Sequence, residues 1–311
     1  MPHSFSVSRR DFLARASAAA LLTSSPALAN ASTSLTGMRL DSPNNDHAAA
    51  VPPIGIELYA LRTELARDLP NTLRTTKQLG YELVEFYAPY MNWTMPYAKD
   101  VRLMLDDLGL RCWSTHNALT SLVPGERMTK AIELNQILGT RYIVVASPPF
   151  ARGTAGQYKA MTEQLAASVS ILAPHGLLAG FHNHAEEWMP MAGGLRPMDV
   201  IADNTPSEFM LQLDVGTCVK AGADPIAWVN AHPGRIRSVH LKDWAPGTDA
   251  EEKGFRVLFG EGTSPWRPLI AALEAVGGVE FYLMEQEGSR FGEFDTAKRC
   301  LETWREMRKG G

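Results

Sequence analysis

The sequence predicts a single (β/α)8 barrel, a ring of eight parallel strands in which a helix follows each strand. Short runs rich in β-branched and aromatic residues alternate eight times with longer amphipathic segments over about 255 residues, the size and rhythm of such a barrel. Glycines fall directly after the helical segments, where a left-handed residue commonly ends a helix. A doubly wound open sheet is the alternative, but it seldom needs eight equal units, and no GxGxxG motif follows the first strand.

Each element is placed by its apolar pattern and by the residues at its ends. The expected strands are 54–58, 81–86, 110–116, 141–146, 177–182, 208–214, 236–241 and 279–285. The expected helices are 68–79, 96–108, 125–138, 156–174, 195–203, 224–231, 265–276 and 293–308. The glycines that end helices are Gly80, Gly109, Gly139, Gly176 and Gly277-Gly278. Asp224-Pro225 and Ser264-Pro265 each predict an N-cap followed by proline at the first helical position.

The first 53 residues are predicted to lie outside the barrel, which takes residues 54–311 as one domain. Arg9-Arg10 precede a mildly apolar run that ends in Ala27-Leu28-Ala29, and the surrounding SRRDFL resembles a twin-arginine export signal. We therefore expect a signal peptide at residues 1–29 and a flexible leader at 30–53. The expected location is periplasmic or secreted, with no stable membrane anchor. An irregular cytoplasmic N-terminus is the alternative.

Charge and cysteine content exclude two classes of function. Removal of residues 1–29 leaves 27 basic against 33 acidic side chains, a net charge of −6. A nucleic-acid partner would require the opposite sign, so none is expected. The three cysteines, Cys112, Cys218 and Cys300, lie far apart and form no CxxC motif. We expect buried thiols and no disulfide framework.

Chemically reactive residues collect at the carboxyl ends of the predicted strands, where (β/α)8 barrels build their active sites. Six strands end at or near such a residue: Glu85, His116, His182, Asp214, His240 and Glu285. His184, Glu186 and Glu187 follow strand five, and Lys242-Asp243 follow strand seven. Each residue alone can be a turn former or a solvated charge, and Glu186 and Glu187 cannot both point inward.

The coincidence of four successive strand ends predicts a metal site. Strands five to eight each bring an imidazole or a carboxylate to the same end, and burial of Asp214 and Glu285 without a counter-charge would be costly. A divalent cation is the simplest partner. Two carboxylates with one or two imidazoles suit Mn²⁺, Co²⁺, Zn²⁺ or Fe²⁺ better than a thiolate site or an all-oxygen calcium cage does.

These residues and motifs resemble the xylose isomerase-like barrels of the sugar phosphate isomerase/epimerase family, which includes ketose 3-epimerases, inosose dehydratases and relatives of endonuclease IV. The resemblance covers residues 54–308 and rests on ELYALR (57–62), FHNHAEE (181–187), LQLDVGTCVKAGADP (211–225), GRIRSVHLKDW (234–244), GEG (260–262) and MEQE (284–287). It implies one divalent metal held by residues from strands five to eight: His182, Asp214, His240 and Glu285.

The chain departs from two branches of that family. Ketose 3-epimerases place a glutamate at strand five and use it with the strand-eight glutamate as opposed bases, whereas this chain has His182. The HNH sequence is more similar to the inosose dehydratase and keto-sugar branch, and it leaves His184 as a substrate contact or an alternative ligand. The endonuclease branch implies a further histidine at position 217, which is Thr217 here.

The resemblance implies proton abstraction next to a carbonyl through an enediolate that the metal stabilises. Glu285 is the expected ligand and base, and His184, Glu187 or Lys242 is the second acid or base. Candidate substrate-binding residues are Tyr59, Glu85 and His116 for hydroxyl groups and Trp244, among the tryptophans near strand ends, for stacking on a sugar.

The expected export of the protein limits the class of substrate. Sugar phosphates are cytoplasmic metabolites, and the sequence has no recognisable glycine-rich phosphate cradle. We therefore expect a metal-dependent isomerase, epimerase or β-eliminating lyase of an unphosphorylated keto-sugar or keto-glycoside. The alternatives are a periplasmic sugar- or metal-binding barrel without turnover and a metal-dependent hydrolase. A homo-oligomer is compatible with the sequence.

Overall fold

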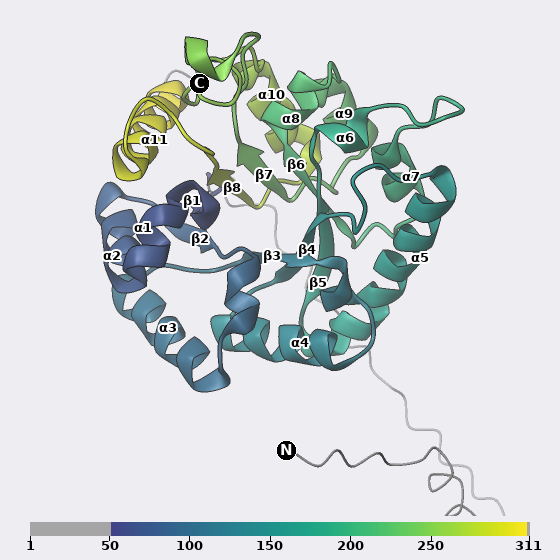
Figure 1. The fold of residues 1–311 in the computed structure, drawn as a ribbon, viewed down its shortest axis with the longest axis horizontal. Coiled ribbons are helices and arrows are strands. Elements are labelled where there is room, and N and C mark those ends of the chain that lie inside the picture. The colour runs from purple at the N-terminus through teal and green to yellow at the C-terminus, as the bar shows by residue number, and fades with distance from the viewer. Residues whose placement is uncertain (1–50, 310–311) are drawn as a thin grey trace, which may run out of the picture. The chain divides into compact units, whose positions relative to one another are not determined.

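Eight parallel strands form the centre of the computed structural model, which describes residues 51–309 (Figure 1). The strands are β1 (Ile54–Glu57), β2 (Leu83–Glu85), β3 (Ser114–Ala118), β4 (Tyr142–Ser147), β5 (Leu178–His182), β6 (Met210–Asp214), β7 (Ser238–Leu241) and β8 (Phe281–Met284). They pair in the order β2-β1-β8-β7-β6-β5-β4-β3. Isolated parallel bridges from Leu83 to Arg111 and from Phe86 to Thr115 join β2 to the β3 segment. The predicted (β/α)8 barrel is confirmed, whereas the predicted signal peptide and nearly all of the leader lie outside the described residues.

Helices follow the strands and surround the ring in Figure 1. They are α1 (Arg62–Arg67), α2 (Leu69–Leu79), α3 (Met95–Leu108), α4 (Glu126–Leu138), α5 (Ala155–Leu172), α6 (Ala185–Trp188), α7 (Pro197–Asp203), α8 (Val215–Lys220), α9 (Pro225–Ala231), α10 (Trp266–Ala272) and α11 (Glu293–Lys309). Short turns are η1 (Leu58–Leu61), η2 (Ala88–Asn92), η3 (Leu119–Leu122), η4 (Ala173–His175), η5 (Asp249–Glu251) and the π-helical η6 (Leu273–Gly277). No helix in the described range is both long and apolar enough to cross a bilayer.

The residues described next were predicted to end or cap helices, and they do so with one exception. Gly80, Gly109 and Gly139 adopt positive φ after their helices, as predicted, and Asp224 caps α9 by accepting hydrogen bonds from two backbone amides. The Ser264-Pro265 prediction is wrong by one residue, because α10 begins only at Trp266 and the Ser264 hydroxyl has no hydrogen-bond partner.

The third strand is displaced from its predicted position. The ladder with β4 begins at Ser114 and continues two residues past the predicted end at His116. Asparagine is a poor strand former, so the sequence indicated that the strand ends before Asn117. The buried Asn117 side chain is satisfied inside the fold, since its oxygen accepts a hydrogen bond from the Tyr90 hydroxyl at 2.7 Å and its amide donates to the Thr115 carbonyl at 2.9 Å.

The barrel interior alternates large and small residues. The even strands supply the apolar cluster Leu83, Tyr142, Val144, Met210, Phe281 and Leu283. The odd strands supply small residues between them: a Cβ built on Gly55 would lie 2.5 Å from the Leu83 Cβ, and one on Gly180 would lie 3.1 Å from the Met210 Cε. Because side chains repeat every two residues along a strand, the next inward residues stand one layer closer to the mouth. That layer is polar.

A larger apolar cluster fills the space between the barrel and the surrounding helices. It includes Cys112, Cys218 and Cys300, which are buried free thiols, as predicted. This packing fixes the strands, and with them the polar layer at the mouth.

Candidate metal and active site at the barrel mouth

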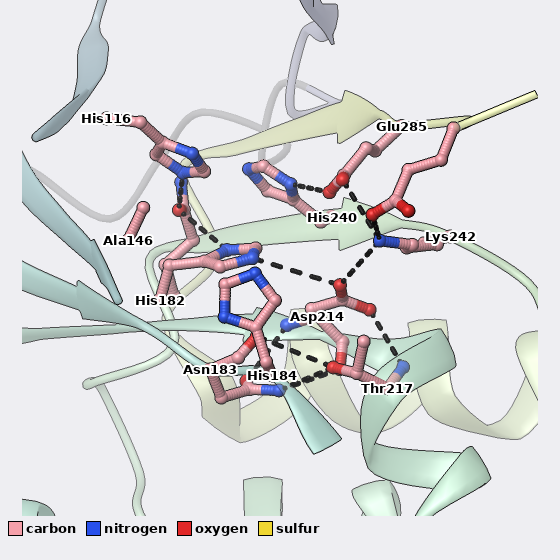
Figure 2. Close-up of polar contacts among 12 residues, drawn as sticks. His116, Ala146, His182, Asn183, His184, Asp214, Thr217, His240, Lys242 and Glu285 are labelled. Atoms are coloured by element: carbon pink, nitrogen blue, oxygen red, sulfur yellow. Dashed lines mark hydrogen bonds and ion pairs between the residues drawn. The ribbon is translucent and has the colours of Figure 1, made fainter. Parts of the chain in front are cut away.

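Polar side chains from several strands point toward one another at the barrel mouth (Figure 2). The odd strands contribute Glu57, His116, His182 and His240, and the even strands contribute Glu85, Gln212 and Asp214, with Glu285 directly after β8. All eight are buried, and the most exposed, His116, is 8% exposed. The structure thus brings together every strand-end residue that the sequence predicted.

Gln212 in this layer determines which ring nitrogen of His182 carries the proton. The amide of Gln212 donates to Glu85 Oε1 at 3.0 Å and to Ser238 Oγ at 3.1 Å, which leaves its oxygen as an acceptor. That oxygen lies 3.1 Å from His182 Nδ1, so Nδ1 carries the proton and Nε2 keeps its lone pair. Burial, helped by His240 and His116, holds the pKa of His182 well below its usual range. His182 is therefore a neutral imidazole with a free ligand atom.

His240 lies between two carboxylates. Its Nδ1 donates to Glu285 Oε2 at 2.5 Å and its Nε2 to Glu85 Oε2 at 2.8 Å. Burial alone would lower the pKa of His240, but the two carboxylates raise it to about 10. Burial alone would likewise raise the pKa of Glu85, but His116 and His240 lower it to about 2. His240 is an imidazolium in this arrangement, and to bind a metal it would have to release one of these hydrogen bonds.

Lys242 places an ammonium group among three carboxylates. Its Nζ lies 3.1 Å from Glu285 Oε1 and 3.5 Å from Asp214 Oδ2, and it also pairs with Glu287 (Figure 2). Lys242 is 1% exposed. Burial opposes its charge, but the carboxylates raise the pKa of Lys242 well above its usual range. Burial alone would raise the pKa of Glu285, but Lys242 and His240 hold it well below its usual range. Lys242 therefore neutralises this side of the mouth.

Asp214 links the strand end to the helix that follows. Its Oδ1 caps α8 by accepting from the Thr217 amide at 3.0 Å, and its own amide donates to Asn183 Oδ1 at 3.0 Å. Asn183 also donates to the Thr217 hydroxyl at 2.9 Å, so the ends of β5 and β6 are held together. Asp214 Oδ2 is buried and accepts no hydrogen bond. Burial raises the pKa of Asp214, although Lys242 opposes the rise.

These side chains fit a divalent cation. His182, Asp214 and Glu285 each offer a ligand atom, and the three atoms lie within 4.8 Å of one another. His182 Nε2 and Asp214 Oδ2, neither of which accepts a hydrogen bond, are 3.8 Å apart. A mixed set of one imidazole and two carboxylates suits Zn²⁺, Mn²⁺, Co²⁺ or Fe²⁺. The fourth predicted ligand, His240, groups instead with His116 and His182.

Glu57 belongs to the site and was missed by the sequence analysis. It ends β1, it is 1% exposed, and its Oε1 has no hydrogen-bond partner. Burial raises the pKa of Glu57 well above its usual range, and the charges of Glu285 and Glu85 raise it further. Its signal was present in the sequence, because IGIE places an acidic residue at the end of an apolar strand and at the start of the ELYALR motif.

A cavity of about 780 Å³ opens above this layer. The predicted residues that line it are Tyr59, His116, His182, His184 and Glu285, and Glu57 and Glu287 line it as well. Six predicted residues do not line this cavity. Glu85, Asp214, His240 and Lys242 are buried in the polar layer, Trp244 lies on the loop after β7, and Glu187 lines a neighbouring cavity.

His184 and Glu187 have different positions at the start of α6. His184 is half-buried, and its ring lies 5.0 Å from that of His182 and faces the cavity. Glu187 is buried and accepts a hydrogen bond from the His184 amide at 2.7 Å, while Glu186 is exposed. The prediction that only one of these glutamates points inward is confirmed, and Glu187 is engaged in capping α6.

The fold and this mouth define an enzyme-type barrel with a candidate metal centre, and sequence comparison gives its family. Residues 73–307 match the xylose isomerase-like TIM barrel family, so the chain belongs to that family. An inosose dehydratase of Geobacillus thermodenitrificans is 28% identical over 133 residues, which cover 38% of this chain and 43% of the dehydratase. The chain thus matches less than half the length of that relative.

Solved structures share the fold. A sugar phosphate isomerase/epimerase of Parabacteroides distasonis superposes with a TM-score of 0.68 at 24% identity, covering 82% of this chain and 94% of the other. The IolI protein, solved with a bound zinc atom, superposes with a TM-score of 0.61 at 14% identity, covering 82% and 97%. The family match and the inosose dehydratase relative support an enzyme.

Proposed function

We propose that the protein is a divalent-metal-dependent isomerase, epimerase or β-eliminating lyase of an unphosphorylated keto-sugar or keto-glycoside. The observation that carries the proposal is the group formed by His182, Asp214 and Glu285, of which His182 and Glu285 line the large cavity. Two of its ligand atoms, His182 Nε2 and Asp214 Oδ2, accept no hydrogen bond, although a cation would have to displace the Lys242 ammonium, which lies 3.5 Å from Asp214 Oδ2. Buried polar atoms without partners are costly, and a bound cation would remove that cost.

The acid and base roles follow from the charges at the floor. When bound, a divalent cation would polarise a substrate carbonyl and stabilise the negative charge that develops on it. Glu285 is held ionised by Lys242 and His240, so it can accept a proton from the carbon next to the carbonyl. Burial, with the charges of Glu285 and Glu85, raises the pKa of Glu57 well above its usual range, and Glu57 lines the same cavity, which suits it to donate a proton to a substrate oxygen. Such proton transfers contribute about 10²–10⁴-fold to rates.

The lining of the cavity favours an unphosphorylated substrate. Within the described residues, the cavity is lined by three glutamates and by no lysine or arginine. A phosphate group would meet repulsion there and would lack the cationic partners that normally bind it. Export to the periplasm, which remains a prediction from the N-terminal sequence, agrees with such a substrate.

Two measurements test the proposal. Metal content is determined by mass spectrometry for the wild type, for Asp214→Asn, and for Asp100→Asn as a control on the exposed face of α3. We expect close to one equivalent of Mn, Co, Zn or Fe in the wild type and the control, and its loss in Asp214→Asn. Keto-sugars are then incubated with the metal-loaded protein in deuterium oxide, and we expect deuterium on the carbon next to the carbonyl.

Other outcomes would favour the other functions. A protein that folds normally, holds no metal and stays inert when metals are added would favour a sugar-binding barrel without turnover. Cleavage of a substrate with no deuterium at carbon would favour a metal-dependent hydrolase, because hydrolysis does not require exchange of a C–H bond.

A further inference from the structure

The large cavity is divided between a polar side and an apolar side. Strands β5 and β8 and the ends of β1 and β3 supply its acids and imidazoles, which are Glu57, His116, His182, His184, Glu285 and Glu287. The segments that follow β1, β3 and β4 supply apolar side chains. These are Tyr59, Leu119, Val123, Pro148 and Pro149, which we call the apolar wall.

The apolar wall offers surface to a ligand. Tyr59 is 39% exposed, Val123 and Pro148 are half-buried, and Pro149 is exposed. The Tyr59 ring is held edge-on against the Tyr87 ring, with centroids 5.3 Å apart and an interplanar angle of 87°. A fixed aromatic ring beside aliphatic and proline side chains is a surface that binds apolar groups at low entropic cost.

The volume of the cavity also favours a ligand that carries an apolar group. Its volume of about 780 Å³ falls in the upper part of the range of roughly 300–1,000 Å³ that accommodates drug-sized ligands. A free monosaccharide, with its hydroxyl groups directed to all sides, would leave the apolar wall unused and would expose its own hydroxyls to that wall without hydrogen-bond partners.

We propose that the apolar wall is a subsite for the apolar aglycone of a keto-glycoside whose sugar ring lies over the polar side. The inference rests on the proposed function, because that function places the keto group of the sugar at Glu285 and His182. It narrows the substrate class from keto-sugars in general to glycosides that carry an aryl or comparable apolar group.

A matched pair of probes tests the subsite. Phenyl and methyl glucosides, both anomers of each, are oxidised to the ketone at C3, and their affinities are measured by calorimetry on purified metal-loaded protein. Because the phenyl group adds buried apolar area at the wall, we expect it to bind about tenfold or more tightly than the methyl group. Equal affinity for phenyl and methyl, or no measurable binding of any phenyl glycoside, would overturn the proposal.

Two valine variants test whether the phenyl group binds at the apolar wall. Val123→Asp is compared with Val276→Asp, in which the substituted valine is 39% exposed and lies outside the cavity. We expect the first to weaken phenyl-glycoside binding about tenfold with little change for the methyl glycoside, and the second to change neither. If Val123→Asp does not fold, Val123→Thr and Val276→Thr replace the pair. Equal losses in the two valine variants would refute a subsite at the wall.

Deuterium uptake separates failure of the inference from failure of the proposed function. Equal uptake into methyl and phenyl keto-glucosides, together with equal affinity, would keep the function and overturn the aglycone subsite. A phenyl preference that Val123→Asp abolishes, without deuterium uptake from any keto-glucoside, would keep the wall as a binding surface and overturn the proposed chemistry.

Discussion

Replacement of Lys242 by methionine tests the electrostatics of the site most directly. Methionine has a similar length and volume, so the change removes the charge with little loss of packing. The 1% exposed ammonium contacts Asp214 and Glu285, which are themselves buried, and its loss leaves both carboxylates with one fewer counter-charge. Breaking a buried ion pair by removal of one partner costs about 3–5 kcal/mol. For a domain of this size that corresponds to a fall in Tm of about 6–20 °C.

A divalent cation should reverse much of this loss. The cation would supply the missing positive charge to the same carboxylates, and a ligand at a hundredfold excess over its Kd stabilises the folded state by about 2.7 kcal/mol. We therefore expect Mn²⁺ or Zn²⁺ to raise the Tm of Lys242→Met more than that of the wild type, in which the ammonium lies 3.5 Å from the free Asp214 oxygen and opposes the incoming charge.

Thermal unfolding followed by circular dichroism measures the fall in Tm in EDTA and the rise in Tm with added metal. Lys298→Met is the control. Lys298 is solvent-exposed and forms a surface pair with Glu302 at 3.9 Å, and such a pair contributes less than about 1 kcal/mol. The reasoning is refuted if Lys242→Met unfolds at the wild-type temperature in EDTA, or if metal stabilises the variant and the wild type equally.

Two further predictions concern the layer around the site. Glu85 has its pKa lowered from 4.5 to about 2, so it stabilises the fold above pH 4.5 by about 3 kcal/mol and loses this as the pH falls from 4.5 through 2. Urea unfolding in EDTA should show Glu85→Gln less stable than the wild type at pH 7 and closer to it near pH 2, and a pH-independent difference would contradict the assignment. Gly55→Ala should cost about 1–3 kcal/mol because its Cβ would lie 2.5 Å from the Leu83 Cβ, whereas Gly292→Ala, with nothing within 4 Å, should cost much less.

The fold was predictable because the local signals agree with one another. Left-handed glycines and the Asp224 cap mark helix ends by backbone chemistry that does not depend on the rest of the chain. The boundary of β3 was not predictable in the same way. Asn117 extends that strand only because Tyr90, distant in sequence, supplies a buried hydrogen-bond partner. Tertiary contacts of this kind override local propensity.

The site was predictable in part for a similar reason. The residues at the strand ends indicate which groups reach the mouth, and His182, Asp214 and His240 lie there. A count of two residues back from Asp214 would also have placed Gln212 in the inward layer. Glu57 was missed because β1 ends there, one residue before the predicted end at 58. The ammonium of Lys242 among the carboxylates depends on which strand ends meet across the mouth, which no single segment records.

The imidazole at strand five changes how such a site can work. The polar layer already contains Glu57, Glu85, Asp214 and Glu285, and among residues 51–309 Lys242 and His240 are the positive charges that offset them. A glutamate at position 182, which the resemblance implies for ketose 3-epimerases, would add a further buried negative charge between Asp214 and the others, whereas neutral His182 adds none. The second proton-transfer group must then come from another strand. Glu57 meets that need, since burial raises its pKa well above the usual range and the residue lines the cavity. We expect Glu57→Gln to lower kcat with little change in metal content.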